Sequence, residues 1–298
     1  MNIPENYEQI PHGDMPGDKV CITPKHIEKA TTIYPRLQEE MRAVAVPASG
    51  KLVIGVCGGS GVGKSETASL LGWMLTQDGI PAYILSGDNY PYRIPAENDA
   101  ERQRVYEAGG EAALRSYLGT KEEADYDQLN EIIRSFKAGD STVRLKRMGR
   151  TPEELWYDDV DMSDKQVLII EWTHASSELL KGVDIVILLN STPEETLEHR
   201  RKRARDGAVD SPFTMLVLKI EQEQLMAEAP RAKIILTKDG RIISYEEYCQ
   251  IMNIKNGLLW GSPEKAAIPK SICVCCRKTA VHTLFYVESE KRSQTMGG

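Results

Sequence analysis

One glycine-rich segment, which ends in Lys64 and Ser65, constrains this chain more than any other. It matches the pattern G-x4-G-K-[ST], in which glycines let backbone N–H groups turn inward around phosphate oxygens. In such a loop the lysine reaches the β- and γ-phosphates, where it also stabilises charge during transfer, and the serine hydroxyl ligates Mg²⁺. We therefore predict a site for a nucleoside triphosphate, taken to be ATP, with Mg²⁺. Its residues are Gly58, Gly59, Ser60, Gly61, Val62, Gly63, Lys64, Ser65 and Glu66.

The residues around this loop predict the fold. The apolar run 52–57 is short, partly β-branched and ended by glycines, as expected of a buried parallel strand, and a helix from 64 to about 77 follows. Further strands are predicted at 82–86, 167–171, 185–189 and 233–236, with helical segments at about 98–108, 111–118 and 126–138. This alternation predicts an α/β fold with a mainly parallel sheet of about five strands. With the glycine-rich loop, it predicts the P-loop NTPase three-layer sandwich. Ligands then bind at the carboxyl ends of the strands.

The ends of the chain are expected to be appendages. Within residues 1–50, four prolines precede a helical stretch from His26 to about Val44, which we interpret as an N-terminal arm with one amphipathic helix. Residues 51–253 form the predicted P-loop domain, and residues 254–298 a C-terminal appendage. The appendage holds Cys273, Cys275, Cys276 and His282, whose residue types suit zinc but whose spacing is not that of common zinc sites. Reduced thiols are the simpler interpretation.

Composition argues against several classes of partner. The formal net charge of −7 argues against a general role in binding nucleic acid. No apolar run approaches the roughly 20 residues needed to span a bilayer, so no membrane partner is expected. The first residues are polar and acidic, unlike a secretory signal, and the cytoplasm is the predicted location. The sequence leaves open whether the protein forms a homodimer.

Two carboxylates at predicted strand ends are candidates for chemistry at the phosphates. Asp88 could orient an acceptor hydroxyl and take its proton, whereas capping a turn with Asn89 is the alternative. Glu171 could contact Mg²⁺, its waters or the acceptor, with an ordinary strand-end acid as the alternative. The chain lacks the guanine-reading element of GTPases, because residues 237–239 read Thr-Lys-Asp without the residue that separates Lys from Asp. These features favour a phosphotransferase.

An arginine-rich segment follows the fourth predicted strand. On a helix Arg201 and Arg205 share one face, while Arg200 and Arg203 share another, so some could close over the phosphates. A solvated helix with ion pairs between successive turns is the alternative. We predict a lid in which Arg201 and Arg205 bind the nucleotide and Arg201 also stabilises charge on the transferring group.

These motifs together resemble the uridine kinase and phosphoribulokinase family of P-loop kinases. The glycine loop, Asp88-Asn89-Tyr90, the stretch 124–139 and the arginine-rich segment each look like a motif of that family, and the resemblance covers about residues 52–236. It implies transfer of the γ-phosphoryl group of ATP to a hydroxyl of a small molecule, and a substrate-contacting hairpin after residue 139. One departure concerns the third strand, because Glu171 is followed by Trp172 where the family usually has glycine.

The sequence constrains the identity of the acceptor substrate less than it constrains the nucleotide site. The presumed hairpin at 143–150 is strongly basic, which suits an anionic acceptor better than a neutral nucleoside, although these side chains could simply face water. The Gly-Asp-Asn stretch with Arg93 also looks like that of adenylylsulfate kinases. The predicted acceptor-binding residues are Asp88, Tyr90, Tyr92, Arg93, Arg144, Arg147 and His174. The chain is thus predicted to be an ATP-dependent kinase for a small anionic metabolite. An adenylylsulfate-kinase-like enzyme and a nucleotide-responsive regulatory or interaction protein are the alternatives.

Overall fold

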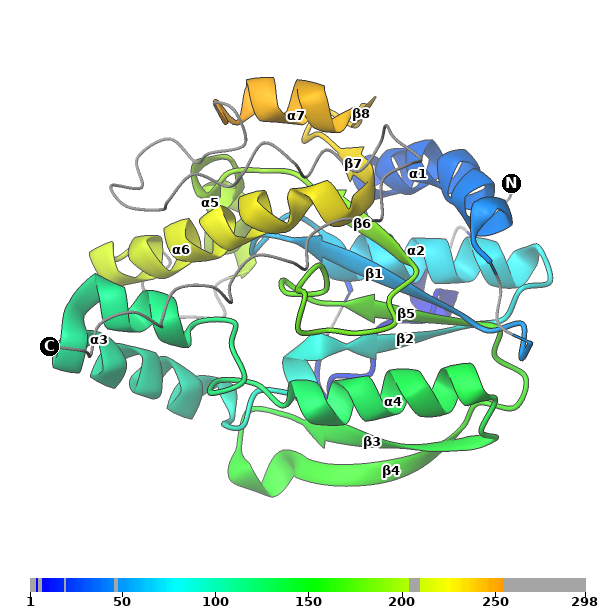
Figure 1. Cartoon of the computed structure of the whole chain (residues 1–298), viewed down its shortest axis with the longest axis horizontal. Coiled ribbons are helices and arrows are strands. Elements are labelled where there is room, and N and C mark those ends of the chain that lie inside the picture. The colour runs from blue at the N-terminus through cyan, green and yellow to red at the C-terminus, as the bar shows by residue number, and fades with distance from the viewer. Residues whose placement is uncertain (1–3, 5–6, 19, 46–47, 204–209, 255–298) are drawn as a thin grey trace, which may run out of the picture. The chain divides into compact units, whose positions relative to one another are not determined.

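The glycine-rich loop connects a central strand of a parallel sheet to a helix (Figure 1). The computed structural model describes residues 4, 7–18, 20–45, 48–203 and 210–254. In this part of the chain the sheet has the strand order β2-β5-β1-β6-β7-β8, in which only β8 is antiparallel to its neighbour. Its strands are β1 (Leu52–Gly58), β2 (Ala82–Ser86), β5 (Val167–Glu171), β6 (Ile185–Leu189), β7 (Ala232–Leu236) and β8 (Ile242–Ile243). The predicted α/β fold with its five parallel strands is confirmed, and β8 is an addition.

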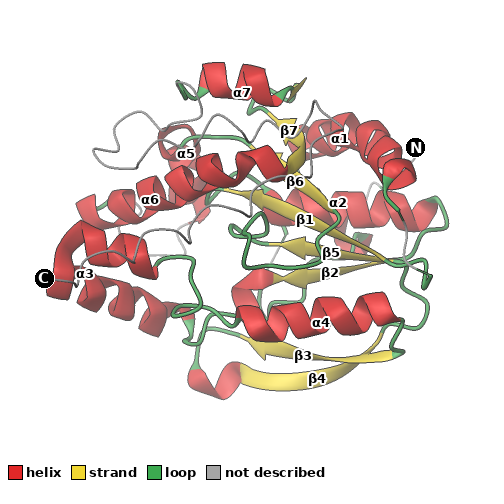
Figure 2. Ribbon diagram, in the orientation of Figure 1, coloured by secondary structure: helices red, strands yellow, loops and turns green. Residues whose placement is uncertain are grey.

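Helices cover both faces of this sheet, which gives three layers (Figure 2). The central strands β1, β5 and β6 are buried along their whole length, which is why their sequences are continuous apolar runs. Side chains alternate between the faces: Ile54 and Val56 pack in one core with α1 and α2, whereas Val53 and Cys57 pack in the other with α4. The helices are α1 (Pro24–Ala43), α2 (Lys64–Gln77), α3 (Pro95–Tyr117), α4 (Tyr126–Ala138), α5 (Pro193–Arg203), α6 (Pro212–Glu228) and α7 (Tyr245–Ile251).

The N-terminal helix α1 belongs to the same compact unit as the sheet. It buries Ala30, Ile33, Tyr34 and Leu37, which recur at the spacing of one helix face. These residues pack with α2 and with the sheet in a single hydrophobic core. The predicted amphipathic helix is therefore present, and its apolar face is covered by the domain that follows it. None of the described helices is both long enough and apolar enough to cross a lipid bilayer.

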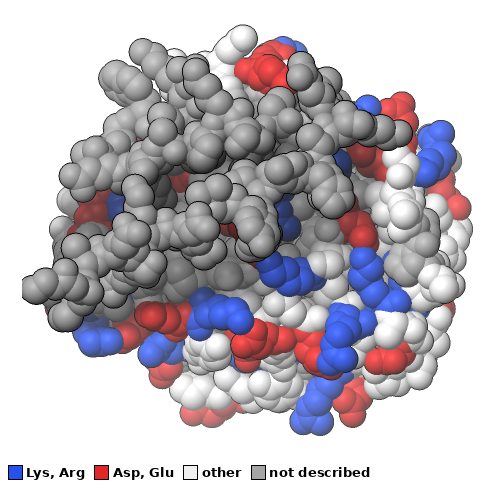
Figure 3. Space-filling model, viewed as in Figure 1, with Lys and Arg blue, Asp and Glu red and all other residues white. Residues whose placement is uncertain are grey.

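A separate two-stranded hairpin lies beyond α4 (Figure 1). It consists of β3 (Thr142–Met148) and β4 (Leu155–Asp161), paired antiparallel. The first strand carries the basic residues noted in the sequence, but the second carries Asp158 and Asp159, and Arg144 lies directly opposite Asp159. On the face seen in Figure 3, where grey atoms do not cover it, basic and acidic side chains are intermingled. The hairpin is thus present, and much of its positive charge has acidic neighbours.

Candidate active site

The phosphate-binding loop has the backbone that its glycines predict. Gly61 has φ +77°, and a Cβ there would lie 2.9 Å from Cγ of Arg200, so a side chain would be both strained and crowded. The next helix, α2, begins at Lys64, so its free N–H groups and the positive end of its dipole meet at the loop. Lys64 Nζ donates to the carbonyl of Gly59 at 3.2 Å. These features fit a bound polyphosphate.

Glu171 lies at the carboxyl end of β5 beside this loop. Its side chain is 3% exposed and accepts hydrogen bonds from Ser65 Oγ (3.2 Å) and Ser86 Oγ (2.7 Å). Burial, and next the nearby Asp88 carboxylate, raise the pKa of Glu171 to about 8, against the opposing effects of Lys64 and Ser86. Serine and carboxylate oxygens are ligands that Mg²⁺ prefers, and a cation here would favour the ionised form of Glu171. Ser65 and Glu171 therefore fit a magnesium-bound nucleotide.

A cavity of about 460 Å³ opens from the phosphate-binding loop. Its loop end is lined by Ser60, Gly61, Lys64, Ser65, Asp88, Glu171 and Arg200. Asp88 lies on the short 3-10 turn η2 (Gly87–Asn89), which follows β2 directly. A Cβ on Gly87 would lie 2.2 Å from Cγ of Trp172, so glycine allows the Trp172 ring to lie against this turn. The tryptophan that departs from the family pattern therefore forms part of the cavity wall next to Asp88.

The far end of the cavity is lined by α3, α6 and the loop before α4. Arg102 Nε donates to Glu123 Oε1 at 2.6 Å, and Arg102 Nη2 lies 3.8 Å from Glu221 Oε1. Asn98 Nδ2 and the Gly119 N–H also donate to Glu123, at 3.0 and 2.6 Å. Burial opposes the ionisation of Glu123, but Arg102 and the Gly119 N–H outweigh it and lower its pKa. Burial raises the pKa of Glu221 despite Arg102. This wall is polar, buried and rich in carboxylates.

Three of the predicted acceptor-binding residues line the cavity, namely Asp88, Arg93 and His174. His174 is 7% exposed and its ring packs edge-on against Trp172. Burial lowers its pKa to about 4, with Arg102 and Lys64 acting in the same direction and Glu123 opposing them. His174 therefore faces the cavity as a neutral imidazole near pH 7, able to form hydrogen bonds but not to supply charge.

The structure does not bring the other four, Tyr90, Tyr92, Arg144 and Arg147, to the cavity. Tyr90 is fully buried in the core, and the side chain of Tyr92 is half exposed. Arg144 lies over the ring of Tyr157, 5.3 Å from its centroid, on the hairpin surface. Arg147 is ion-paired with Asp14 at 2.7 Å. The physical reasons differ: core packing holds Tyr90, whereas strand pairing places Arg144 and Arg147 on β3 and an ion pair holds Arg147.

Two adjacent arginines on α5 occupy different environments. The sequence indicated Arg201 for the site, but Arg200 is the one that lines the cavity. Arg201 is 58% exposed and pairs with Asp210 at 2.5 Å, away from the residues that line the cavity. Arg200 is 6% exposed, donates to the carbonyl of Pro193 at 2.7 Å and lines the cavity. The reason is helix orientation, because α5 packs against α6. Arg205 lies outside the described residues, as do Cys273, Cys275, Cys276 and His282.

Helix α1 lies against the phosphate-binding loop and the first turn of α2. Glu66 is buried in the first turn of α2, close to His26 of α1. Lys29 Nζ, also from α1, lies 3.4 Å from the carbonyl of Val62. The N-terminal helix thus supports the outer side of the loop.

Sequence reasoning missed the polar wall formed by Arg102, Glu123 and Glu221. Arg102 and Glu123 carry no motif, and only the fold brings them together. Glu221 did carry a signal, because it shares a helix face with Val217 and Leu225, both buried. An acid in the middle of an apolar face is a candidate for a buried functional group.

Comparison with known proteins agrees with this geometry. The model of the Phosphoribulokinase / Uridine kinase family matches residues 53–209, more than half of the chain. The chain belongs to this family. The predicted resemblance to these P-loop kinases is thereby confirmed, and the class of enzyme that the family supports is a phosphotransferase acting on a hydroxyl group of a small molecule.

Individual relatives were also found. The chain is 44% identical over 221 residues to the bifunctional alpha-galactosidase/sucrose kinase AgaSK of Mediterraneibacter gnavus. The match covers 74% of this chain but only 23% of that protein. Among solved structures, phosphoribulokinase from Rhodobacter spheroides is similar at 20% identity, with a TM-score of 0.48 over 64% of this chain and 71% of that one. D-glycerate 3-kinase from Cryptococcus neoformans is similar at 12% identity, with a TM-score of 0.45 over 75% of this chain and 99% of that one.

Proposed function

We propose that this chain is an ATP-dependent kinase that phosphorylates a hydroxyl group of a neutral sugar. The observation that carries the proposal is the single cavity that joins the phosphate-binding loop to the polar wall on α3 and α6. A triphosphate at the loop end and a small acceptor at the other end would share this space, and Asp88 lines the same cavity. The proposed catalytic unit is the predicted domain 51–253, with helix α1 packed on it.

The charges at the acceptor end favour a neutral polyol over an anion. Carboxylates line this end at Asp99, Glu123 and Glu221. Guanidinium groups of Arg93, Arg102 and Arg150 line the cavity too. Arg102 is held between Glu123 and Glu221, and Arg93 lies 3.8 Å from Glu101, so two of these three charges already have acidic partners. An anion would be repelled by the carboxylates, whereas sugar hydroxyls can donate to carboxylates and accept from guanidinium groups.

Apolar side chains complete this wall in a way that suits a sugar ring. Phe213 of α6 lines the cavity and packs against Tyr106 of α3, with ring centroids 5.6 Å apart. An aromatic face beside hydrogen-bonding groups can contact the C–H face of a sugar while its hydroxyls bind polar groups. The name of the relative AgaSK includes sucrose kinase. Because the shared family is one of kinases, we assign the matched region to that activity, and sucrose is the first acceptor to test.

The residues of this chain have distinct roles in the proposed reaction. Asp88 takes the proton of the acceptor hydroxyl as its oxygen bonds to the γ-phosphorus and the bond to the β–γ bridging oxygen breaks, releasing ADP. Lys64 and Arg200 stabilise negative charge on the transferring group. Ser65, with Glu171 beside it, would hold Mg²⁺ through the nucleotide, and the ion would neutralise phosphate charge. Glu221 and His174 would hold the acceptor hydroxyls.

An acceptor screen with a matched pair of variants tests this function. ADP release is measured with ATP and Mg²⁺ in the presence of sucrose, monosaccharides, sugar phosphates, uridine and adenylylsulfate. We expect neutral sugars to stimulate release and Asp88→Asn to lower kcat by about 10²- to 10⁴-fold while ATP affinity is nearly unchanged. Asp127→Asn serves as the control, because Asp127 is an exposed acid that pairs with Lys121.

The other outcomes of this screen are also decisive. Turnover of sugar phosphates or adenylylsulfate alone would replace the neutral-sugar proposal with an anionic acceptor. ATP binding without acceptor-dependent ADP release across the panel would favour a nucleotide-responsive regulatory protein. Full turnover by Asp88→Asn would remove Asp88 from its proposed role.

A further inference from the structure

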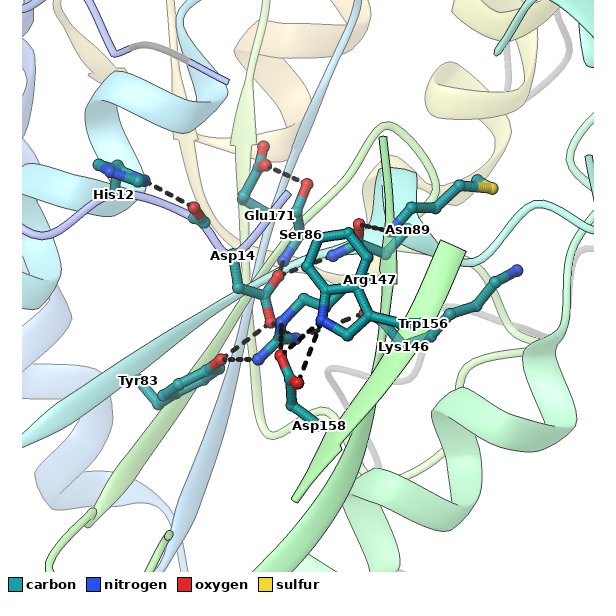
Figure 4. Close-up of polar contacts among 12 residues, drawn as sticks. His12, Asp14, Tyr83, Ser86, Asn89, Lys146, Arg147, Trp156, Asp158 and Glu171 are labelled. Atoms are coloured by element: carbon teal, nitrogen blue, oxygen red, sulfur yellow. Dashed lines mark hydrogen bonds and ion pairs between the residues drawn. The ribbon is translucent and has the colours of Figure 1, made fainter. Parts of the chain in front are cut away.

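We propose that Asp14 is a positioning residue, through which the N-terminal arm holds the turn that carries Asp88 in place. The inference rests on the proposed function, because it assigns the arm a part in that same site. Asp14 lies far from the phosphate-binding loop in the sequence and before the region that the family model matches. In the structure it lies beside the end of β2 (Figure 4).

The Asp14 carboxylate accepts hydrogen bonds from four groups of three different elements. The Ser86 N–H and Asn89 Nδ2 donate to Oδ1 at 2.8 and 2.9 Å. Arg147 Nη1 and the Tyr83 hydroxyl donate to Oδ2 at 2.7 and 3.0 Å. Arg147 in turn donates to the Tyr83 hydroxyl at 3.0 Å and lies 3.2 Å from Asp158 (Figure 4). Asp14 is therefore the shared acceptor of β2, the turn η2 and the hairpin.

These contacts hold the turn η2, which carries Asp88, at Ser86 and at Asn89. Ser86 and Asn89 flank Asp88 on its two sides, and both are bound to the same Asp14 oxygen. The Ser86 hydroxyl donates to Glu171, while Asn89 Oδ1 accepts from the N–H of Met148, which lines the cavity. Asp14 thus connects the backbone that carries Asp88 to Glu171, through Ser86, and to the hairpin residue Met148, through Asn89. A displacement of about 1 Å in such a group can lower a rate about 10²-fold.

The arm around Asp14 also forms part of the cavity. Met15 and Asp18 line it together with Asp88 and Glu171. A Cβ on Gly13 would lie 3.4 Å from Glu171 Oε1, so the arm passes close to this carboxylate. The described site is therefore completed by residues that precede helix α1.

Burial makes this arrangement sensitive to loss of either charge. The side chains of Asp14 and Arg147 are 9% and 10% exposed. Burial raises the pKa of Asp14, whereas Arg147 and the hydrogen-bond donors oppose the shift. Removing one partner of a buried ion pair leaves the other uncompensated, which destabilises the protein as well as moving the turn. A test must therefore separate positioning from stability.

The test compares Asp14→Asn with Asp158→Asn, which removes a carboxylate from the same arginine. Asp158 is about half exposed on β4, and among the described residues its side chain pairs with Arg147 and Trp156 rather than with β2 or η2. The full chain is assayed for kcat, acceptor KM, Mg-ATP affinity and Tm. We expect Asp14→Asn to lower kcat by about 10- to 100-fold while Mg-ATP affinity stays within about threefold of wild type. Asp158→Asn should stay within about threefold in both.

A double variant, Asp14→Asn with Arg147→Met, removes the uncompensated charge. A positioning role predicts that Tm recovers towards wild type while kcat stays low. Recovery of kcat along with Tm would show a purely structural role and overturn the inference. So would wild-type kcat in Asp14→Asn, or equal losses in the two single variants. If wild-type protein showed no acceptor-dependent ADP release, the proposed function itself would fail, which is a distinguishable result.

Discussion

Arg200 and Arg201 are neighbours in the sequence but differ in what they contact. Arg200 is buried at the cavity beside Gly61, whereas Arg201 forms an exposed ion pair with Asp210. Exposed ion pairs contribute about 1 kcal/mol or less, while a preorganised cation at a transferring phosphoryl group contributes far more. The chemistry of the two side chains is identical, so only their placement can separate their effects.

We predict that Arg200→Met lowers kcat/KM for ATP by about 10²-fold and that Arg201→Met lowers it by less than about threefold. Steady-state kinetics of both variants checks this, and Tm shows whether each is folded, since Arg200 also binds the carbonyl of Pro193. A greater loss in Arg201→Met would mean that the segment rearranges to bring Arg201 over the phosphates, as the sequence first indicated.

At the scale of elements, the loop between β1 and α2 combines backbone strain with crowding. Gly61 has φ +77° and has Arg200 as a neighbour, whereas Gly79, just after α2, has φ +79° and open space within 4 Å of the position that a Cβ would take. The two glycines therefore differ in surroundings but not in backbone region. The comparison isolates the effect of the loop on ligand binding.

We predict that Gly61→Ala and Gly79→Ala each lower the free energy of unfolding by about 1 to 2 kcal/mol, because both residues need a left-handed backbone. Only Gly61→Ala should also weaken Mg-ATP binding, by about tenfold or more, since its methyl group displaces Arg200. Chemical denaturation and calorimetry measure the two effects. Equal nucleotide affinity in the two variants would contradict the assignment of Gly61 to the phosphate cradle.

At the scale of the whole molecule, buried titratable groups at the site make stability depend on pH. The pKa of Glu171 is about 8 in the folded protein, against about 4.3 in an unfolded chain. The folded state therefore binds the extra proton between these values, and stability falls as pH rises. The pKa of His174 is about 4 when folded and about 6.5 when unfolded, so its effect has the opposite sign and ends near pH 6.5.

We therefore predict that the ligand-free protein loses stability between about pH 6.5 and 8, by up to about 1.4 kcal/mol per pH unit from Glu171. Glu171→Gln should lack this part of the slope, and saturating Mg²⁺ with nucleotide should reduce it, because a cation favours the ionised carboxylate. Urea denaturation at several pH values measures the slope. Identical pH profiles for wild type and Glu171→Gln would rule out this titration.

The sequence predicted those elements whose conformation is set by residues close to one another in the chain. The glycine loop, the buried strands and the helix that begins at Lys64 follow from local backbone preference and from apolar period, so their positions in the chain were readable. The placement of Asp88 and Glu171 at one sheet edge also followed, because parallel strands end on the same side.

Only the tertiary structure decided which charged side chains reach the cavity. Arg147 is bound to Asp14, 133 residues away, while Arg102 of α3 meets Glu123 of the loop before α4 and Glu221 of α6. The energies of such pairs depend on distance and burial, which no local pattern encodes, so a basic stretch alone could not show which arginines face a ligand. Sequence by itself determined the phosphate-binding loop, and packing determined the polar wall formed by Arg102, Glu123 and Glu221.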